Sequence, residues 1–260
     1  MDRLLEATAR AERDHFWFRG FRRFVAPLVA EAAGGREHAM LLDCGCGTGN
    51  NLSMLRRYGR AVGIDLTWSG LAFARGRGAR ALVQASATSL PFPDASFDVV
   101  TSFDVIYALE DTDEAAALRE MSRVLRPGGH LVINVAAMDL LRGNHSVLAG
   151  EVRRYSRRTL RERLERNGFD VRRLTYTNAT ILPVVAAVRL LQRVSGHKES
   201  HQEIAIPPAP VNAALAAVLA LEAAAIRIVN MPFGSSLLAL ARRVQNPPVQ
   251  RVQEGSRGST

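Results

Sequence analysis

Three glycines at alternate positions, Gly45, Gly47 and Gly49, follow a short apolar run and precede a stretch with helical spacing. Glycine lets the backbone approach a ligand closely, and the free N–H groups at a helix N-terminus can bind that ligand. Asp65 ends the next apolar run, 20 residues after Gly45. A carboxylate at that place can accept hydrogen bonds from both hydroxyls of a ribose. The turn and the acid together predict a site for a nucleoside-containing cofactor.

The spacing of these glycines bears on which nucleoside cofactor the site takes. The dinucleotide fingerprint has two residues between its second and third glycines, whereas one residue lies between Gly47 and Gly49. An NAD-type dehydrogenase is therefore the weaker alternative. A glycine turn that binds no ligand is the other one.

Four segments of the chain resemble the class I S-adenosylmethionine-dependent methyltransferases, in particular the methyltransferase type 11 group. They have the order and spacing of that family and lie within residues 39 to 136, at Asp43–Asn50, Gly63–Leu66, Leu90–Val100 and Glu120–Gly129. The resemblance implies a Rossmann-like methyltransferase fold and S-adenosyl-L-methionine as the cofactor.

The resemblance also implies roles for individual residues. Asp43 would reach the ammonium group of the cofactor, Asp65 its ribose and Leu66 one face of its adenine. Ser86 stands where the family usually has an Asp for the adenine amino group, and its hydroxyl can still accept that hydrogen bond with less charge assistance. The whole implied cofactor set is Asp43, Gly45, Cys46, Gly47, Asn50, Asp65, Leu66, Ser86, Ala87, Ser102 and Phe103.

Two side chains are candidates for taking a proton from an acceptor, because Ala108 stands where the family often has a histidine. One is Tyr107, and its plainer alternative is an aromatic packed at a strand end. The other is His145, in the loop between Gly143 and Gly150, and its alternative is an ordinary surface histidine. An amine or an already ionised acceptor would need neither of them as a base.

An aromatic cluster near the N-terminus, His15 to Phe18, offers further contacts with the cofactor. Three successive aromatic side chains cannot all face one side of a helix, so some pack inward while another can cover a site. We expect Trp17 to line the pocket. Arg19 is a candidate for a two-fold hydrogen bond with the cofactor carboxylate.

The elements that must position these residues alternate along the first half of the chain. Short apolar runs separated by helical stretches are typical of a parallel α/β sheet. A turn at Pro127-Gly128-Gly129 should precede the fifth strand. We predict a doubly wound, seven-stranded, mostly parallel sheet with an antiparallel last strand, its strands at 39–44, 61–66, 81–84, 97–102, 130–135, 171–177 and 235–244.

One domain should occupy residues 1–245, with N-terminal helices in 1–36 and a flexible tail in 246–260. A helical insertion, 178–232, should separate the last two strands, with helices near 182–194 and 211–230.

The second helix of the insertion is apolar almost all round. Such a helix covers a greasy pocket, packs in a core or rests in a membrane interface. We favour a lid over the acceptor, with Leu219 on its apolar side, and keep core packing and peripheral membrane contact as alternatives.

Composition narrows the class of protein. The net charge is +9, but 33 of the 34 basic residues are Arg, a skew typical of codon bias that does not favour nucleic acid as a partner. Cys44 and Cys46 are one residue apart and cannot supply a disulfide framework or a four-ligand zinc site, so we expect no metal. The start of the chain lacks the apolar segment of a secretory signal. We expect a cytoplasmic protein, with membrane association as the alternative.

The sequence therefore predicts methyl transfer from S-adenosylmethionine to a small, apolar or lipid-like acceptor. The competing class is a catalytically idle cofactor-binding or scaffold protein of the same fold, which the missing histidine makes conceivable.

Overall fold

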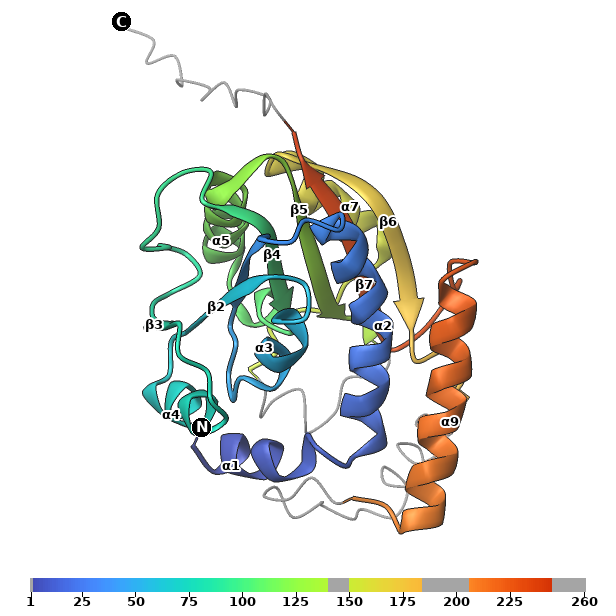
Figure 1. The fold of residues 1–260 in the computed structure, drawn as a ribbon. Coiled ribbons are helices and arrows are strands. Elements are labelled where there is room, and N and C mark those ends of the chain that lie inside the picture. Colours follow the sequence, from blue (N-terminus) through green and yellow to red (C-terminus); the bar gives the residue numbers. More distant parts are fainter. Residues whose placement is uncertain (1, 140–149, 184–205, 245–260) are drawn as a thin grey trace, which may run out of the picture.

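A seven-stranded sheet forms the centre of the protein, and the computed structural model describes residues 2–139, 150–183 and 206–244. The strand order is β3-β2-β1-β4-β5-β7-β6, and β7 runs antiparallel to both of its neighbours (Figure 1). This confirms the predicted mostly parallel sheet with an antiparallel last strand. The strands are β1 (Met40–Cys44), β2 (Arg60–Asp65), β3 (Leu82–Gln84), β4 (Phe97–Phe103), β5 (Leu125–Ala136), β6 (Phe169–Thr177) and β7 (Ser236–Arg243).

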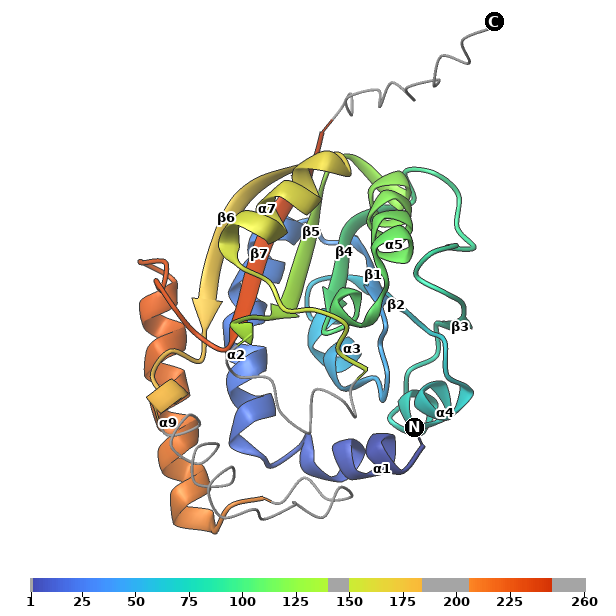
Figure 2. The ribbon, with the colours of Figure 1, turned by 180° about the vertical axis from the view of Figure 1, so that it is seen from behind.

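Helices cover both faces of the sheet, which explains why its central strands are continuous apolar runs. On one face α2 packs against β4 and β5 and α3 packs against β1 and β2, and on the other face lie α5 and α7 (Figures 1 and 2). The helices are α1 (Asp2–Ala11), α2 (Phe16–Ala33), α3 (Asn50–Leu55), α4 (Trp68–Gly76), α5 (Asp111–Val124), α7 (Arg157–Arg166) and α9 (Ala209–Ile226), with a 3-10 turn η1 (Ile106–Ala108).

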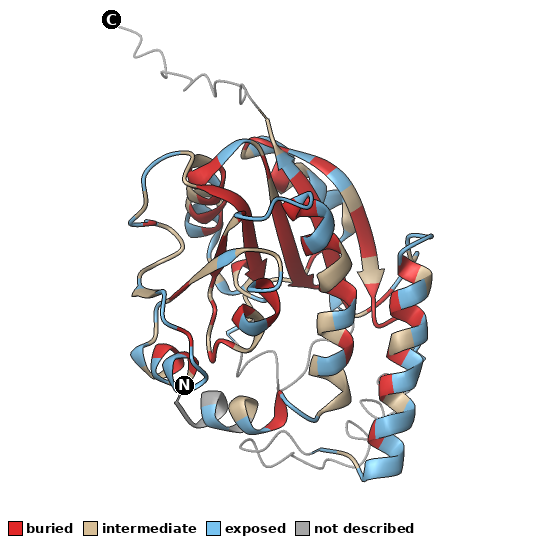
Figure 3. Ribbon diagram, viewed as in Figure 1, coloured by how far each residue is buried: buried red, intermediate tan, exposed pale blue. Residues whose placement is uncertain are grey.

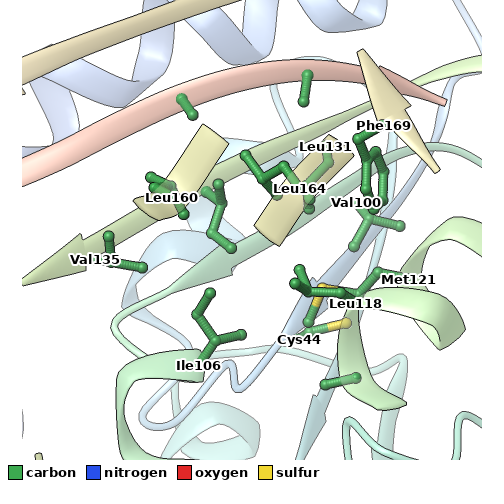
Figure 4. Packing of buried hydrophobic residues seen from close by; sticks show 14 of the residues in the cluster. Cys44, Val100, Ile106, Leu118, Met121, Leu131, Val135, Leu160, Leu164 and Phe169 are labelled. Atoms are coloured by element: carbon green, nitrogen blue, oxygen red, sulfur yellow. The ribbon is translucent and has the colours of Figure 1, made fainter. Parts of the chain in front are cut away.

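The hydrophobic core has one cluster of buried side chains on each face. Figure 4 shows part of the cluster beneath α5 and α7, in which Leu118 and Met121 from α5 and Leu164 from α7 meet Leu131 of β5 and Phe169 of β6. Complete burial of such side chains stabilises the fold by about 1.5–3 kcal/mol each. The strands and both sets of helices are therefore held in one rigid unit, which fixes the positions of the loops at the strand ends.

Two local predictions can be compared with the structure directly. Ser156 caps α7, since its hydroxyl accepts a hydrogen bond from the Thr159 N–H at 3.2 Å and the Thr159 hydroxyl accepts one from the Ser156 N–H at 2.9 Å. The turn predicted at Pro127-Gly128-Gly129 is wrong as a strand boundary, because β5 already begins at Leu125. The ladder with β4 is irregular there, between Phe97 and Val99, so the strand passes through these residues with a local bend.

The lid prediction is also wrong for the part of the insertion that the structure describes. The buried side of α9 packs on α2, and α2 in turn lies on the sheet, so that this side does not face the ends of the strands (Figures 1 and 2). Leu219 lies against Gly20 of α2. Three predictions fall outside the described residues: the candidate base His145, the first helix of the insertion beyond residue 183, and the tail 246–260.

Candidate cofactor and acceptor site

The glycine turn lies where β1 ends at the centre of the sheet, between β2 on one side and β4 on the other. Strand order reverses at this point, and such a switch point is where open α/β sheets bind ligands. Gly47 has a φ of 48°, in the left-handed region, and a Cβ placed on it would meet no atom within 4 Å. The backbone of Gly47 therefore faces open space, as a ligand cradle requires.

Asp65 stands at the end of β2 and fixes this turn. Its Oδ2 accepts a hydrogen bond from the Gly47 N–H at 2.8 Å, and its Oδ1 accepts bonds from the Thr67 N–H at 2.8 Å and hydroxyl at 2.6 Å. An ionised carboxylate has about four acceptor positions. Asp65 is thus held in place by three protein donors and can still accept from a ribose, with the exposed Leu66 beside it.

Asp43 is the buried acid of the turn. Its Oδ1 accepts a hydrogen bond from the Thr101 hydroxyl at 2.7 Å, whereas its Oδ2 has no partner within the described residues. Burial raises the pKa of Asp43 to about 7, and the nearby charge of Asp65 acts in the same direction. A buried acceptor without a donor is rare in folded proteins. The free oxygen fits a cationic group such as an ammonium.

The segment predicted to read the adenine lies next to Asp65. The Ala85 N–H donates to the Asp65 carbonyl at 3.1 Å, which places Ser86 and Ala87 just beyond the end of β2. The Ser86 hydroxyl lies 2.7 Å from that of Thr88. A hydroxyl can serve as donor and acceptor at once, so Ser86 can contact Thr88 and still bind an amino group.

Aromatic side chains close the other side of the turn, at the end of β4. The ring of Phe103 packs edge-on against Phe21 of α2, with 5.2 Å between ring centroids. Trp17, one α2 turn earlier, is partly buried against the same cluster. Ser102 is buried, and its hydroxyl has no partner in the part of the chain that the structure describes. This side of the site is therefore mainly apolar.

Sequence reasoning missed one acidic residue here, Asp104. It has a φ of 60°, its N–H donates to the Asn134 carbonyl at 3.0 Å, and its Oδ1 accepts from Asn134 Nδ2 at 2.8 Å. The residue is exposed to solvent, although protein atoms pack closely around its carboxylate. Desolvation raises the pKa of Asp104 to about 6; the hydrogen bond from Asn134 opposes this rise, and the charge of Glu151 adds to it. Its neighbour Val105 contacts Gly45, so Asp104 lies close to the glycine turn.

Comparison with known proteins agrees with this geometry. Residues 42–133 match the family model of the methyltransferase domain. The ubiquinone/menaquinone biosynthesis C-methyltransferase UbiE of Shewanella sp. (strain ANA-3) is 36% identical over 126 residues, which are 44% of this chain and 49% of that protein. The chain thus spans about half the length of the curated relatives it matches. Residues 42–133 form a class I S-adenosylmethionine-dependent methyltransferase domain.

Solved structures extend the likeness beyond this methyltransferase domain. A Haloferax volcanii protein solved in complex with the Trm112 methyltransferase activator has a TM-score of 0.58 and 20% identity, covering 92% of this chain and 97% of that chain. A geranyl diphosphate methyltransferase in complex with SAM has a TM-score of 0.56 and 15% identity, covering 84% of each chain. At identities this low the likeness shows the fold alone. Because it covers 92% of this chain, the shared fold extends well beyond residues 42–133.

Of the two predicted bases, Tyr107 lies at the acceptor side of the methyltransferase domain, in η1. Burial and the neighbouring charge of Asp104 raise the pKa of its phenol well above its ordinary value. A phenol with a raised pKa stays protonated at neutral pH, so Tyr107 is suited to donate a hydrogen bond rather than to take a proton.

One predicted cofactor residue is placed differently from what we expected, and another stays a prediction. Arg19 is exposed on α2, and its contact with the cofactor carboxylate remains untested. Cys46 is buried, and a Cβ on Gly63 would lie 2.8 Å from its sulfur. Its side chain therefore packs the turn onto β2, and only its backbone is available to a ligand. Asn50 begins α3 and is partly exposed beside the turn.

A second residue that sequence reasoning missed ties the N-terminal helices to the methyltransferase domain. Glu12 is buried, and its Oε2 accepts hydrogen bonds from the Thr48 hydroxyl at 2.6 Å and from Arg77 Nη1 at 2.5 Å. Arg77 also donates to the Ala9 carbonyl at 2.7 Å. Thr48 belongs to the glycine turn, so α1 holds that turn from outside. Glu12 is one acid among many charged residues near the end of α1, so the sequence alone does not indicate such a contact.

Proposed function

We propose that this protein transfers a methyl group from S-adenosylmethionine to a small, apolar acceptor. The observation that carries the proposal is the pair of acids around the open side of Gly47. Asp43 offers a buried oxygen without a partner in the described chain, and Asp65 is fixed by three donors at the adjacent strand end. An ammonium and a ribose of one ligand match these two acids.

The residues present fit the cofactor. Asp43 would hold its ammonium, Asp65 its ribose hydroxyls and the Gly47 backbone its amino-acid part, while Leu66 and Ser86 would contact the adenine. When bound, S-adenosylmethionine supplies an activated methyl group for a nucleophilic acceptor atom. The protein contributes alignment and exclusion of water, which are the main requirements for a displacement of this kind.

The acceptor side supports an apolar substrate. Phe21, Phe103 and Trp17 supply aromatic side chains on that side, next to the polar Ser102 and Asp104. The Shewanella relative acts in ubiquinone and menaquinone biosynthesis, and acceptors of that class fit such a surface. The match to that relative covers only 44% of this chain, however. The apolar class therefore rests on the aromatic residues of this chain.

Asp104 is our candidate for the group that takes a proton from the acceptor. It is reachable from solvent, lies at the end of β4 and is oriented by Asn134. A pKa of about 6 leaves it mostly ionised at neutral pH but more basic than an ordinary carboxylate. It stands one turn before the position where the family often has a histidine.

Two measurements on the purified chain test the function. Titration calorimetry should show binding of S-adenosylmethionine and none of NAD. Mass spectrometry of a cell extract incubated with the chain and deuterated-methyl cofactor should then show label in an apolar metabolite. Stabilisation by NAD instead would contradict the proposal. Cofactor binding without any labelled product would favour the idle cofactor-binding alternative.

A further inference from the structure

The outer side of α9 is an apolar surface that no other described element covers. Leu221 is 74% exposed and Ile228, just past the helix end, 87% exposed. Seven residues separate them, so they share the side of the helix opposite the buried Leu219. Figure 3 shows this outer side as exposed along the edge of the molecule. The exposed large apolar residues from 206 to 233 are Ile206, Val211, Val218, Leu221, Ile228, Val229 and Phe233, which we call the α9 surface.

The inner side fixes α9 firmly to the domain. A Cβ on Gly20 would lie 2.5 Å from Leu219 Cδ1, so the two helices are in close contact. Asn212 accepts a hydrogen bond from the Phe16 N–H at 2.8 Å and donates to the Asp14 carbonyl at 2.8 Å. Buried Glu222 accepts bonds from the Ala179 and Thr180 N–H groups, both at 2.9 Å. These anchors keep the α9 surface turned outward.

These anchors also decide how α9 can meet a membrane. Its length and hydropathy would allow it to cross a bilayer. A crossing would, however, take Asn212 and Glu222 from their partners into hydrocarbon, where unsatisfied polar groups cost several kcal/mol each. The helix can therefore contact a bilayer only with its outer side, lying along the interface.

The exposed charges around the α9 surface are positive. Between residues 206 and 235 the sequence has two ionisable side chains, the buried Glu222 and the exposed Arg227. Exposed Arg23 of α2 donates to the Ala216 carbonyl at 3.1 Å, on the same flank of the helix as Arg227. Arg173 of β6 donates to Asn230 Oδ1 at 3.2 Å at the far end. The apolar strip thus has cations along its margin and no exposed acid of its own.

We propose that the α9 surface docks onto a bilayer that contains anionic lipids, with α9 lying parallel to the membrane plane. Apolar side chains would enter the boundary between headgroups and acyl chains, while Arg23, Arg173 and Arg227 would meet lipid phosphates. A second copy of the chain is a poorer occupant, because a symmetric contact would bring the same arginines together. This docking does not depend on the proposed methyl transfer.

Docking would orient the methyltransferase domain relative to the bilayer. Asn212 holds the first residues of α2, and Phe21 in the next turns of α2 contacts Phe103 of the acceptor side. The membrane-bound helix is therefore joined through α2 to the end of β4.

Vesicle sedimentation of the full chain tests the docking. The chain should bind vesicles of equimolar phosphatidylcholine and phosphatidylglycerol, and bind phosphatidylcholine alone much more weakly. Leu221→Gln and Ile228→Gln leave the net charge unchanged and should each weaken binding by about tenfold. Trp68→Gln is the matched control, because Trp68 is 62% exposed on α4, and it should bind as the unaltered chain does. Arg23→Gln and Arg227→Gln should each weaken binding to the anionic vesicles by about fivefold.

Three results would overturn the proposal. The first is no binding to anionic vesicles, and the second is binding that Leu221→Gln and Ile228→Gln leave unchanged. The third is a dimer in light scattering without lipid that Leu221→Gln dissociates, which would assign the α9 surface to a second copy. The circular dichroism spectra of Leu221→Gln and Ile228→Gln should match that of the unaltered chain, because both side chains are exposed.

Discussion

Glu12 accepts a hydrogen bond from Thr48 across 36 residues of sequence, at 2.6 Å. The contact joins α1, which contributes nothing to the sheet, to the turn that carries Gly47. Arg77 bonds to the same carboxylate oxygen, so three segments of the chain meet at one atom. The N-terminal helices therefore support the cofactor site from outside.

Removing this contact should weaken both fold and site. Glu12→Ala leaves the Thr48 hydroxyl without its acceptor and Arg77 without its counterion, and we expect the free energy of unfolding to fall by about 1–3 kcal/mol. Affinity for S-adenosylmethionine should fall with it, because the turn loses a support. Urea unfolding and calorimetry measure the two effects. Glu6→Ala within α1 is the control: Glu6 is half exposed, pairs with Arg10 at 3.8 Å, and should change neither value.

Asp65→Asn should reduce affinity for S-adenosylmethionine by about ten- to a hundredfold. The ribose would lose a charged acceptor at the position that the three protein donors leave free, and one hydrogen bond to a charged group is worth about 1.5–3 kcal/mol. Calorimetry measures the change, and a thermal unfolding curve checks that the turn around Gly47 stays folded. Asp94→Asn makes the same chemical change at an exposed acid paired with Arg123 and should leave affinity intact. Equal affinity in Asp65→Asn would remove the ribose assignment.

Cofactor binding should depend on pH through Asp43. Its pKa of about 7 means that the free protein carries a proton there below neutrality. An ammonium next to Asp43 favours the ionised form, so binding expels that proton and affinity rises as the pH increases toward about 7. Calorimetry at pH ~6 in buffers of different ionisation enthalpy should show proton release. Asp43→Asn should abolish this release; an undiminished release would place the titrating group elsewhere.

Asp104→Asn should lower turnover without loss of cofactor affinity. Asn tolerates the left-handed backbone at this position, so the variant removes the proton acceptor and keeps the fold. A positioned base contributes about 10²–10⁴-fold. Turnover of the unaltered protein should rise with pH through about 6, because Asp104 must lose its proton to act. Asp113→Asn, at an exposed acid of α5, is the control. If Asp104→Asn keeps full rate, the acceptor needs no base.

Leu219 and Leu221 should differ sharply although they lie two residues apart. Leu219→Ala opens a cavity against Gly20 of α2, and we expect the free energy of unfolding to fall by about 2–5 kcal/mol. Leu221→Ala trims an exposed side chain and should change it by less than about 0.5 kcal/mol. Urea unfolding of the two variants compares them directly. Equal losses would mean that α9 is covered on both sides in solution.

Sequence patterns were sufficient where a local arrangement sets the structure. The spacing from Gly45 to Gly49 and the acid Asp65 depend on backbone conformation within a few residues, and the structure has both where the pattern predicts them. The Ser156 cap is equally local. The Pro127–Gly129 segment misled us, because proline and glycine mark turns in most contexts but here lie in the irregular part of a ladder.

Features that arise from tertiary contacts could not be predicted. An apolar helix gives the same pattern whether it covers a pocket or another helix, and the choice depends on Gly20, which leaves room for Leu219. Similarly, Asp104 follows an ordinary strand, and its raised pKa comes from the protein around it. Glu12 finds Thr48 only when α1 is folded against the turn.

The place of β7 in the sheet has a consequence for biosynthesis. Among the strands that the structure describes, β7 is the one neighbour of β6, and β7 also completes the ladder of β5. During synthesis, residues 169–177 of β6 leave the ribosome well before residues 236–243 of β7. Until β7 is available, the edges of β5 and β6 that it covers have unpaired backbone hydrogen-bonding groups. During that interval two strand edges and the apolar α9 are open to other chains. Translation pauses or truncations before Ser236 should therefore lead to aggregation or chaperone capture rather than to a smaller folded domain.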